Sequence, residues 1–171
     1  LKILEGESGE ALTKQLSLLH QRALPDLGNN IKCGNSLIGP DYFAGRLMPD
    51  PDELRRVNPF DWEHEFPQAF HPSPASGRRD GDEGGFDCVV GNPPYIRIQT
   101  MKEWAPLEVE AYKELYATAS SGNYDIYVVF VEKALSLLNK HGQLGFILPH
   151  KFFNAQYGEP LRSLLATSKC L

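Results

Sequence analysis

The chain has few cysteines and no long apolar run. No stretch approaches the ~18–20 apolar residues needed to cross a bilayer, and the first residues lack the charged-then-apolar pattern of a signal peptide. Cys33, Cys88 and Cys170 are an odd number without C-x-x-C spacing, and two of them lie in or beside expected strands. We therefore expect buried free thiols in a reducing cytoplasm and no membrane partner.

Positive charge is also scarce. Lys and Arg number 17 against 22 Asp and Glu, which gives a net charge of −5. Affinity for DNA phosphates comes from clustered Lys and Arg. The one tight basic pair outside the expected helices, Arg78-Arg79, is flanked by Asp80, Asp82 and Glu83. A large phosphate-binding surface is therefore not expected on this segment, although 171 residues suffice for one domain with a sizeable core.

A third absence concerns cofactor binding. The first eighty residues contain no glycine-rich turn after a strand, which a nucleotide-type cofactor site needs near its first βα turn. The chain also begins with Leu1 rather than Met. We therefore expect an internal fragment that lacks part of such a site.

The most informative segment present is Asn92-Pro93-Pro94-Tyr95, directly behind the apolar run Phe86–Gly91. The run predicts a buried strand, and ligands bind at the carboxyl ends of strands in open α/β sheets. An ordinary tight turn is the alternative, because Asn-Pro and Pro-Pro are common in loops. A chance match to these four residues is expected on the order of once in a thousand such chains or less.

These four residue types suit the handling of a planar amine. The exocyclic amino group of adenine is a poor nucleophile, so a catalyst must accept hydrogen bonds from both N–H groups and hold the nitrogen in line with an electrophile. Asn92 offers its side-chain oxygen and Pro93 its backbone carbonyl, whose direction the prolines fix. The Tyr95 ring can stack on an extruded base, which is worth about 1–3 kcal/mol. Stacking needs the ring and not the hydroxyl, so Phe should serve at Tyr95 and Ala should not.

Hydrophobic periodicity predicts a parallel α/β arrangement. Helices are expected near residues 12–23, 61–70, 126–137 and 161–165, and strands at 30–33, 86–91 and 143–148. Gly142 is expected to cap the third helix at its carboxyl end. A long loop insertion is expected at about 40–85, around the aromatic helix, and a connecting segment at about 98–121. That segment could be helical and contact DNA, or be a surface helix with a few buried aromatics.

Acidic residues and a histidine in the 61–70 segment raise the hypothesis of a metal site. Asp61, Glu63, His64 and Glu65 are close in sequence, but adjacent residues on a helix do not face one another. No second His stands at metal-ligand spacing. We therefore predict no metal and favour a packing role for the segment.

Four sequence blocks resemble a known family. Residues 86–97 (FDCVVGNPPYIR) resemble motif IV of the amino-group DNA methyltransferases. Residues 30–39 (NIKCGNSLIG), 61–70 (DWEHEFPQAF) and 123–149 resemble the adenine-specific enzymes of type IIG restriction-modification systems. The resemblance implies a Rossmann-like S-adenosylmethionine-dependent methyltransferase fold, of which residues 1–171 would be a partial catalytic domain, roughly its second half. It also implies a bacterial or archaeal cytoplasm.

The resemblance further implies a reaction. A methyl group would pass from S-adenosylmethionine to the N6 nitrogen of an adenine flipped out of double-stranded DNA, by direct in-line displacement. A target-recognition domain elsewhere in the protein would make most DNA backbone contacts. The residues that would act on the adenine are Asn92, Pro93, Pro94 and Tyr95.

Two residues match family positions near the cofactor. Asn35 stands where the family commonly has an acidic residue that contacts the cofactor's adenine, and its oxygen can still accept that hydrogen bond. Asp125 matches the start of the helix after the NPPY motif, on the cofactor side. The simpler explanation for Asp125 is an anion favoured by the dipole at a helix N-terminus.

Other functions are compatible with the motif. NPPY is shared with protein-glutamine and RNA methyltransferases, but the glutamine enzymes typically end the next strand in an acidic-apolar-Gly pattern, whereas this chain has Phe146-Ile147-Leu148-Pro149. A non-catalytic nucleic-acid-binding remnant of a restriction system is the alternative from a different class. The intact motif favours an enzyme.

The isolated chain of residues 1–171 should bind S-adenosylmethionine weakly or not at all and should self-associate. One edge of a cofactor pocket offers little contact area, and unpaired strand edges tend to pair with another chain. Calorimetric titration with the cofactor and light scattering on the same sample test both expectations. Micromolar cofactor binding by a monomer would contradict them.

Overall fold

The computed structural model describes residues 28–44, 50–71, 84–120 and 122–168. The chain divides into two units, residues 1–33 and 34–171. The described part of the first unit is a turn at residues 28–30 followed by residues 31–33 without regular structure, so the strand expected at 30–33 is wrong. A strand needs a neighbour to pair with, and no described strand pairs with these residues. The helix expected at 12–23 lies outside the described residues.

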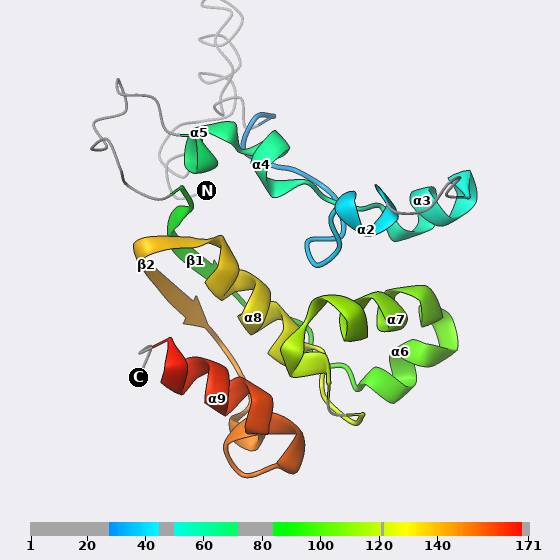
Figure 1. The fold of residues 1–171 in the computed structure, drawn as a ribbon, viewed down its shortest axis with the longest axis vertical. Helices are drawn as coiled ribbons and strands as arrows, with labels where there is room; N and C mark the ends of the chain where they lie inside the picture. Colours follow the sequence, from blue (N-terminus) through cyan, green and yellow to red (C-terminus); the bar gives the residue numbers. More distant parts are fainter. Residues whose placement is uncertain (1–27, 45–49, 72–83, 121, 169–171) are drawn as a thin grey trace, which may run out of the picture. The chain divides into compact units, whose positions relative to one another are not determined.

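A parallel pair of strands organises the second unit (Figure 1). Strand β1 spans Phe86–Gly91, as predicted, and pairs with β2, Leu138–Phe146. Val89 lies opposite Leu144, and Gly91 lies opposite Phe146. Helix α8, Tyr127–Leu137, leads directly into β2 and contacts both strands. The expected parallel α/β arrangement is confirmed for this part of the chain, although β2 begins earlier than predicted and ends at Phe146.

Gly142 does not cap a helix. Helix α8 ends at Leu137, and Gly142 lies inside β2, where the pairing register shifts between Phe86 and Cys88. A Cβ atom on Gly142 would lie 2.7 Å from the carbonyl oxygen of Phe86. The glycine is therefore needed for the close approach of the two strands, a long-range contact that helix-capping rules do not detect.

Strand β1 is more exposed than predicted. Val90 is 77% exposed, and the free thiols of Cys33 and Cys88 are both exposed, so the expectation of buried cysteines is wrong for these two. Cys170 lies outside the described residues. An apolar strand is buried on both faces where helices cover both faces of a sheet. The described elements leave several β1 side chains uncovered.

The segment expected as a long loop insertion contains four short helices. They are α2 (Asp41–Ala44), α3 (Pro51–Val57), α4 (Trp62–Glu65) and α5 (Pro67–Phe70). The single aromatic helix expected at 61–70 is thus two helices, because Pro67 lacks the N–H group that would continue α4. Asp50 and Asp61 cap α3 and α4: the side chain of Asp50 accepts from one backbone N–H group and that of Asp61 from two.

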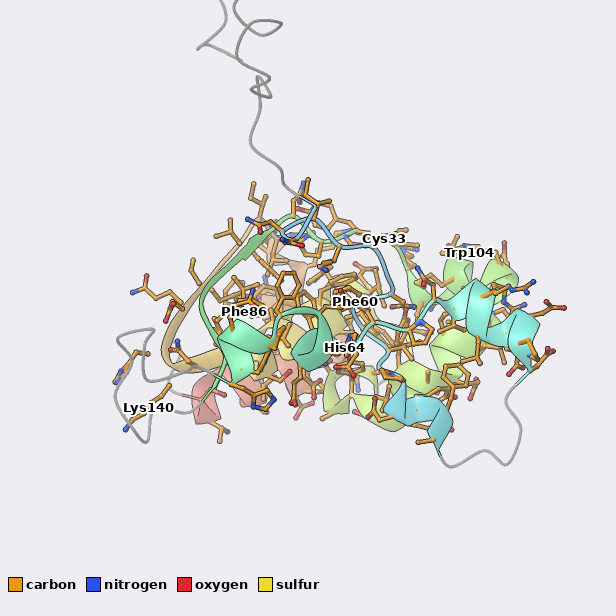
Figure 2. The ribbon with its side chains drawn as sticks, turned by 90° about the horizontal axis from the view of Figure 1, so that it is seen from above. Cys33, Phe60, His64, Phe86, Trp104 and Lys140 are labelled. Carbon is orange, nitrogen blue, oxygen red and sulfur yellow. The ribbon has the colours of Figure 1, made fainter. Side chains whose placement is uncertain are left out.

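Aromatic side chains of residues 62–70 pack on Phe86, the first residue of β1, which Figure 2 labels near these short helices. The ring of Phe86 meets those of Trp62, Phe66 and Phe70 edge-on, with centroids 5.7, 5.7 and 5.4 Å apart. Phe60 extends the cluster through Trp62, at 4.9 Å. The predicted packing role of this segment is confirmed even though its helix is broken.

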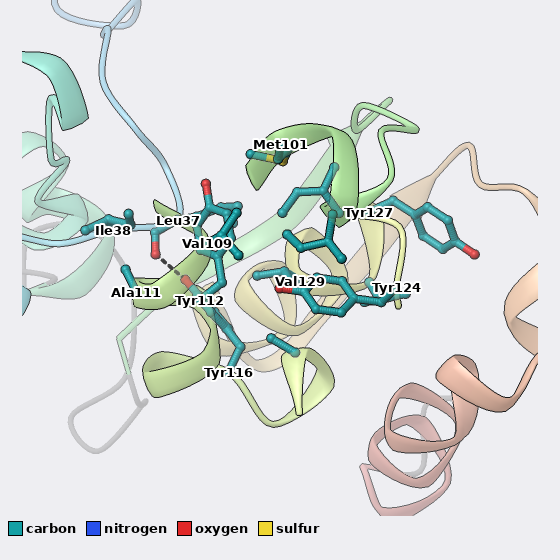
Figure 3. Close-up of a cluster of buried hydrophobic side chains, with 14 of the residues drawn as sticks. Leu37, Ile38, Met101, Val109, Ala111, Tyr112, Tyr116, Tyr124, Tyr127 and Val129 are labelled. Atoms are coloured by element: carbon teal, nitrogen blue, oxygen red, sulfur yellow. Dashed lines mark hydrogen bonds between the residues drawn. The ribbon is translucent and has the colours of Figure 1, made fainter. Parts of the chain in front are cut away.

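The connecting segment after the NPPY motif is helical. It forms α6 (Ile98–Trp104), α7 (Pro106–Leu115) and the short 3-10 helix η3 (Ala117–Ala119). With α8 these helices enclose the main hydrophobic core, in which Val109, Val128 and Val129 are fully buried (Figure 3). The hydroxyl of Tyr116 donates to the carbonyl oxygen of Leu37 and ties the residues before α2 to this core.

The chain after β2 returns through two 3-10 helices, η4 (His150–Phe153) and η5 (Gln156–Gly158), to helix α9, Glu159–Thr167. The predicted last helix is thereby confirmed, and Leu161 buries its side chain completely. The guanidinium of Arg162 donates to the carbonyl oxygens of Phe152 and Ala155, at 2.5 and 2.9 Å, and fastens this return to α9. Among the described helices, none is both long and apolar enough to span a membrane.

Replacing Phe86 by Ala should lower the free energy of unfolding by about 2–4 kcal/mol, because it removes the ring on which three other aromatics pack. Trp104→Ala is the matched control. That side chain is 59% exposed, so its loss should change stability by about 0.5 kcal/mol or less. Chemical denaturation of the two purified variants measures both values. Equal destabilisation by the two substitutions would show that packing in the aromatic cluster contributes no extra stability.

Candidate active site

The NPPY loop, defined as Asn92–Tyr95, leaves the sheet where the carboxyl ends of both strands lie side by side. Gly91 is the last paired residue of β1, and its carbonyl oxygen accepts a hydrogen bond from the N–H of Ile147 at 3.2 Å. Pro93 is buried, whereas Asn92 and Tyr95 are exposed. The loop is therefore anchored through its first proline and presents an amide and an aromatic ring outward.

The hydroxyl of Tyr95 has two close neighbours. Its oxygen lies 2.7 Å from Oδ1 of Asn92 and 2.6 Å from the carbonyl oxygen of Ile147. Sequence reasoning missed both contacts and assigned no function to this hydroxyl. The contact with Ile147 could have been anticipated from the parallel pairing of the two strands, because that pairing places residues after β2 beside residues after β1.

The Tyr95 ring is held at its edge and open elsewhere. It meets the ring of Tyr127 at 6.2 Å between centroids, with the planes 89° apart. The side chain is 47% exposed, so much of its surface is available to a ligand. The ring thus has a defined tilt and a free surface, which are the requirements for stacking on a planar base.

The residues that follow the NPPY loop are bound to the start of α8. Ile96 accepts from the N–H of Ile126 at 2.9 Å, and the N–H of Ile98 donates to the carbonyl of Tyr124 at 3.0 Å. Arg97 and Asp125 form the antiparallel bridge between these bonds. Asp125 is therefore held close to the NPPY loop, as its assignment to the same site requires.

Asp125 belongs to a short hydrogen-bonded chain of tyrosines. The hydroxyl of Tyr157 donates to Oδ2 of Asp125 at 3.3 Å and lies 3.1 Å from the hydroxyl of Tyr127. Burial raises the pKa of the Tyr127 hydroxyl above its ordinary value, so this hydroxyl stays protonated at neutral pH. No side-chain hydrogen bond caps α8. The carboxylate of Asp125 thus has Tyr157 as a side-chain partner.

Asn35 is engaged by the chain's own groups. Its backbone pairs with residues 58 and 59, and its Oδ1 accepts from the N–H of Leu37 at 3.2 Å. Its side chain also lowers the pKa of the Tyr112 hydroxyl, against the larger effect of burial. Among the described residues, no hydrogen bond joins Asn35 to the NPPY loop. The structure therefore brings Asp125 to the loop directly, but not Asn35.

The acidic segment of α4 is not arranged as a metal site. Oδ1 of Asp61 accepts from the backbone N–H groups of Glu63 and His64, both at 3.1 Å, and so caps the helix. Within the described ranges, no group of three or more His, Cys, Asp or Glu side chains could hold a metal ion.

A family model, the Eco57I restriction-modification methylase, matches residues 9–171. The chain belongs to this family. The resemblance found from the NPPY motif and its flanking blocks to type II restriction-modification methyltransferases is confirmed. The mixture of helices and parallel strands is compatible with the fold of S-adenosylmethionine-dependent methyltransferases.

Three relatives illustrate the similarity. The chain is 33% identical over all 171 residues to the "Type II restriction enzyme and methyltransferase RM.Eco57I" of Escherichia coli, and covers 14% of that protein. It is 46% identical over 84 residues, 49% of its length, to the "Type II methyltransferase M.PaeR7I" of Pseudomonas aeruginosa, again 14% of the relative. Over 138 residues, 81% of its length, it is 30% identical to the "Putative type II restriction enzyme and methyltransferase RM.MjaORFECS2P" of Methanocaldococcus jannaschii, 10% of that protein.

Stability should fall as the pH rises from 10 to 12. Burial is the largest influence on the Tyr112 hydroxyl, and it raises the pKa of this group from 10.0 to about 12, against the smaller lowering effect of Asn35. Above pH 10 the unfolded chain therefore loses a proton that the folded chain retains, and the stability that this hydroxyl contributes below pH 10 is lost.

Tyr112→Phe should reduce this alkaline loss by about 1–2 kcal/mol between the two pH values. Tyr42→Phe is the control, because the Tyr42 ring is only half buried. Denaturant titrations at pH 9, 10, 11 and 12 supply the comparison. An alkaline slope that Tyr112→Phe leaves unchanged would contradict the assignment.

Proposed function

We propose that the protein containing this chain transfers a methyl group from S-adenosylmethionine to the N6 nitrogen of adenine in double-stranded DNA, as part of a restriction-modification system. The observation that carries the proposal is the NPPY loop of a restriction-modification methylase family member, anchored at the carboxyl ends of two parallel strands. The relatives' names describe them as type II methyltransferases or combined restriction enzymes and methyltransferases. The chain would be part of a Rossmann-like catalytic domain.

In this proposal Asn92 and Pro93 hold the target amine. Oδ1 of Asn92 and the carbonyl oxygen of Pro93 each accept one N–H of the adenine amino group. Both acceptors then stabilise the positive charge that develops on the nitrogen as it gains a methyl group. The buried ring of Pro93 and the restricted backbone of Pro94 keep the carbonyl direction constant, so that little orientation is lost when the base arrives.

Tyr95 would hold the plane of the flipped base. Its exposed surface stacks on the adenine while its edge contact with Tyr127 fixes the tilt of the ring. S-adenosylmethionine supplies a methyl group on a sulfonium, and the carbon–sulfur bond breaks as the nitrogen–carbon bond forms. No residue of the chain needs to become covalently attached. The methylated nitrogen then loses its extra proton to solvent.

The two proposed cofactor residues retain the hydrogen-bonding capacity that this assignment needs. The amide oxygen of Asn35 has two lone pairs, of which the N–H of Leu37 takes one, so it can accept one further hydrogen bond from the cofactor's adenine. The carboxylate of Asp125 receives a hydrogen bond from Tyr157 and has further acceptor positions. The donor and acceptor chemistry of both residues therefore fits the cofactor.

The acidic composition limits what this chain would contribute to DNA binding. With a net charge of −5 it offers little attraction for phosphates, so DNA binding would depend largely on other parts of the protein. This chain would supply the groups that receive the flipped adenine. Self-association of the isolated chain remains a separate prediction.

In the full-length protein, Asn92→Ala should lower methyl transfer by about 100-fold or more, because the acceptor that holds the reacting nitrogen is lost. Affinity for S-adenosylmethionine should stay within a few-fold, because Asn92 contacts the target amine and not the cofactor. Asn139→Ala, at the amino end of β2, is the matched control and should leave methyl transfer close to normal. Mass spectrometry of nucleosides from methylated DNA gives the readout. Normal N6-methyladenine formation by the Asn92 variant would refute the proposal.

A further inference from the structure

The Tyr95 hydroxyl lies between two oxygen atoms although it has one hydrogen to donate. Oδ1 of Asn92 is 2.7 Å away and the carbonyl oxygen of Ile147 is 2.6 Å away. A backbone carbonyl can only accept, and a phenol carries a single hydrogen. The single hydrogen can lie on the line to only one of these two oxygens. The other oxygen would then face the phenol oxygen at hydrogen-bonding distance with no hydrogen between them.

A half-turn of the Asn92 amide removes this conflict. The oxygen and nitrogen of a side-chain amide occupy equivalent positions, and their assignment follows from the hydrogen-bond network around them. With the nitrogen on the Tyr95 side, the amide donates to the phenol oxygen, and the phenol donates to Ile147. Each of the two contacts then joins one donor to one acceptor, and no other atom has to move.

We propose that the hydroxyl of Tyr95 orients the amide of Asn92, so that the amide nitrogen faces Tyr95 and Oδ1 faces the target amine. This inference rests on the proposed function of the NPPY loop. Tyr95 thereby gains a second role beside stacking. It is a positioning residue, because the hydroxyl acts on the substrate only through Asn92.

The orientation matters because the target is itself a donor. An adenine amino group that met the amide nitrogen would place two N–H donors against each other, whereas Oδ1 accepts the hydrogen that must be held. Without the hydroxyl, the amide can present either end. Ile147 also matters, because its carbonyl oxygen accepts the hydrogen bond from the Tyr95 hydroxyl. The phenol oxygen is then left to act as an acceptor for the Asn92 amide.

Tyr95→Phe in the full-length protein separates the two roles, because it keeps the ring and removes the hydroxyl. We expect kcat to fall about three- to tenfold, the loss that one neutral hydrogen bond produces. KM for DNA and the affinity for S-adenosylmethionine should stay within about twofold of wild type. With 2-aminopurine at the target position, the fluorescence change on base stacking should persist in Tyr95→Phe and be lost in Tyr95→Ala. Tyr42→Phe controls for the loss of a hydroxyl elsewhere.

A double-mutant cycle with Asn92→Asp tests the orienting role itself. A carboxylate has two equivalent acceptor oxygens, so it needs no hydroxyl to choose between its ends. Tyr95→Phe should then cost less than about twofold in the N92D background. An equal or larger loss in that background would overturn the inference, because the hydroxyl would be acting by another route.

The outcomes separate this inference from the proposed function. A wild-type protein that forms no N6-methyladenine refutes the function. A wild-type protein that methylates DNA, with a Tyr95→Phe variant of normal kcat, overturns only the orienting role. If turnover of N92D is too slow to measure, the split between kcat and KM in Tyr95→Phe decides. A lower kcat at unchanged KM supports the orienting role, and a raised KM at unchanged kcat overturns it.

Discussion

The parallel pairing of β1 with β2 is the interaction on which the candidate site depends. It brings the carboxyl ends of the two strands together although Gly91 and Phe146, which lie opposite each other, are 55 positions apart in the chain, and the NPPY loop begins at this junction. The carbonyl of Ile147 then contacts the Tyr95 hydroxyl. A shift of β2 by one residue would turn its side chains to the other face and move this carbonyl away from the loop. The strand register therefore sets the geometry of the proposed base-binding groups.

The second constraint is the helical core that fixes the exit of the NPPY loop. Backbone hydrogen bonds from residues 96 and 98 to the start of α8 hold that exit, and α8 contacts both strands and η3 and shares a buried cluster with side chains of α6 and α7. The loop is thus fixed at both ends, at the sheet and at the core, with two prolines between them. Such a loop can keep amide, carbonyl and ring in place before a substrate arrives, which is where much of the advantage of a preorganised site arises.

Hydrogen-bond partners change the interpretation of individual side chains. The sequence suggested a role only for the ring of Tyr95, yet its hydroxyl lies within hydrogen-bonding distance of both Asn92 and Ile147. Asp125 lies two residues before α8 begins, and it also accepts a hydrogen bond from Tyr157. Oδ1 of Asn35 accepts from the N–H of Leu37, so any contact with a cofactor would use the hydrogen-bonding capacity that remains. In each case the side chain's partners limit which atoms are free for a ligand.

The sequence by itself determined the family, the position of β1, the last helix and the aromatic packing of residues 61–70, because these depend on local periodicity or on a rare motif. It did not determine the break at Pro67 within that segment, the role of Gly142 or the exposure of Cys88. Nor did it show that residues 30–33 lack a strand. Strand formation, close approach and burial depend on which distant segments meet, and the partners of Gly142 and Tyr95 lie more than 50 residues away in the chain. Only the tertiary structure decided them, because a hydrogen bond or a steric contact exists only when both partners are in place.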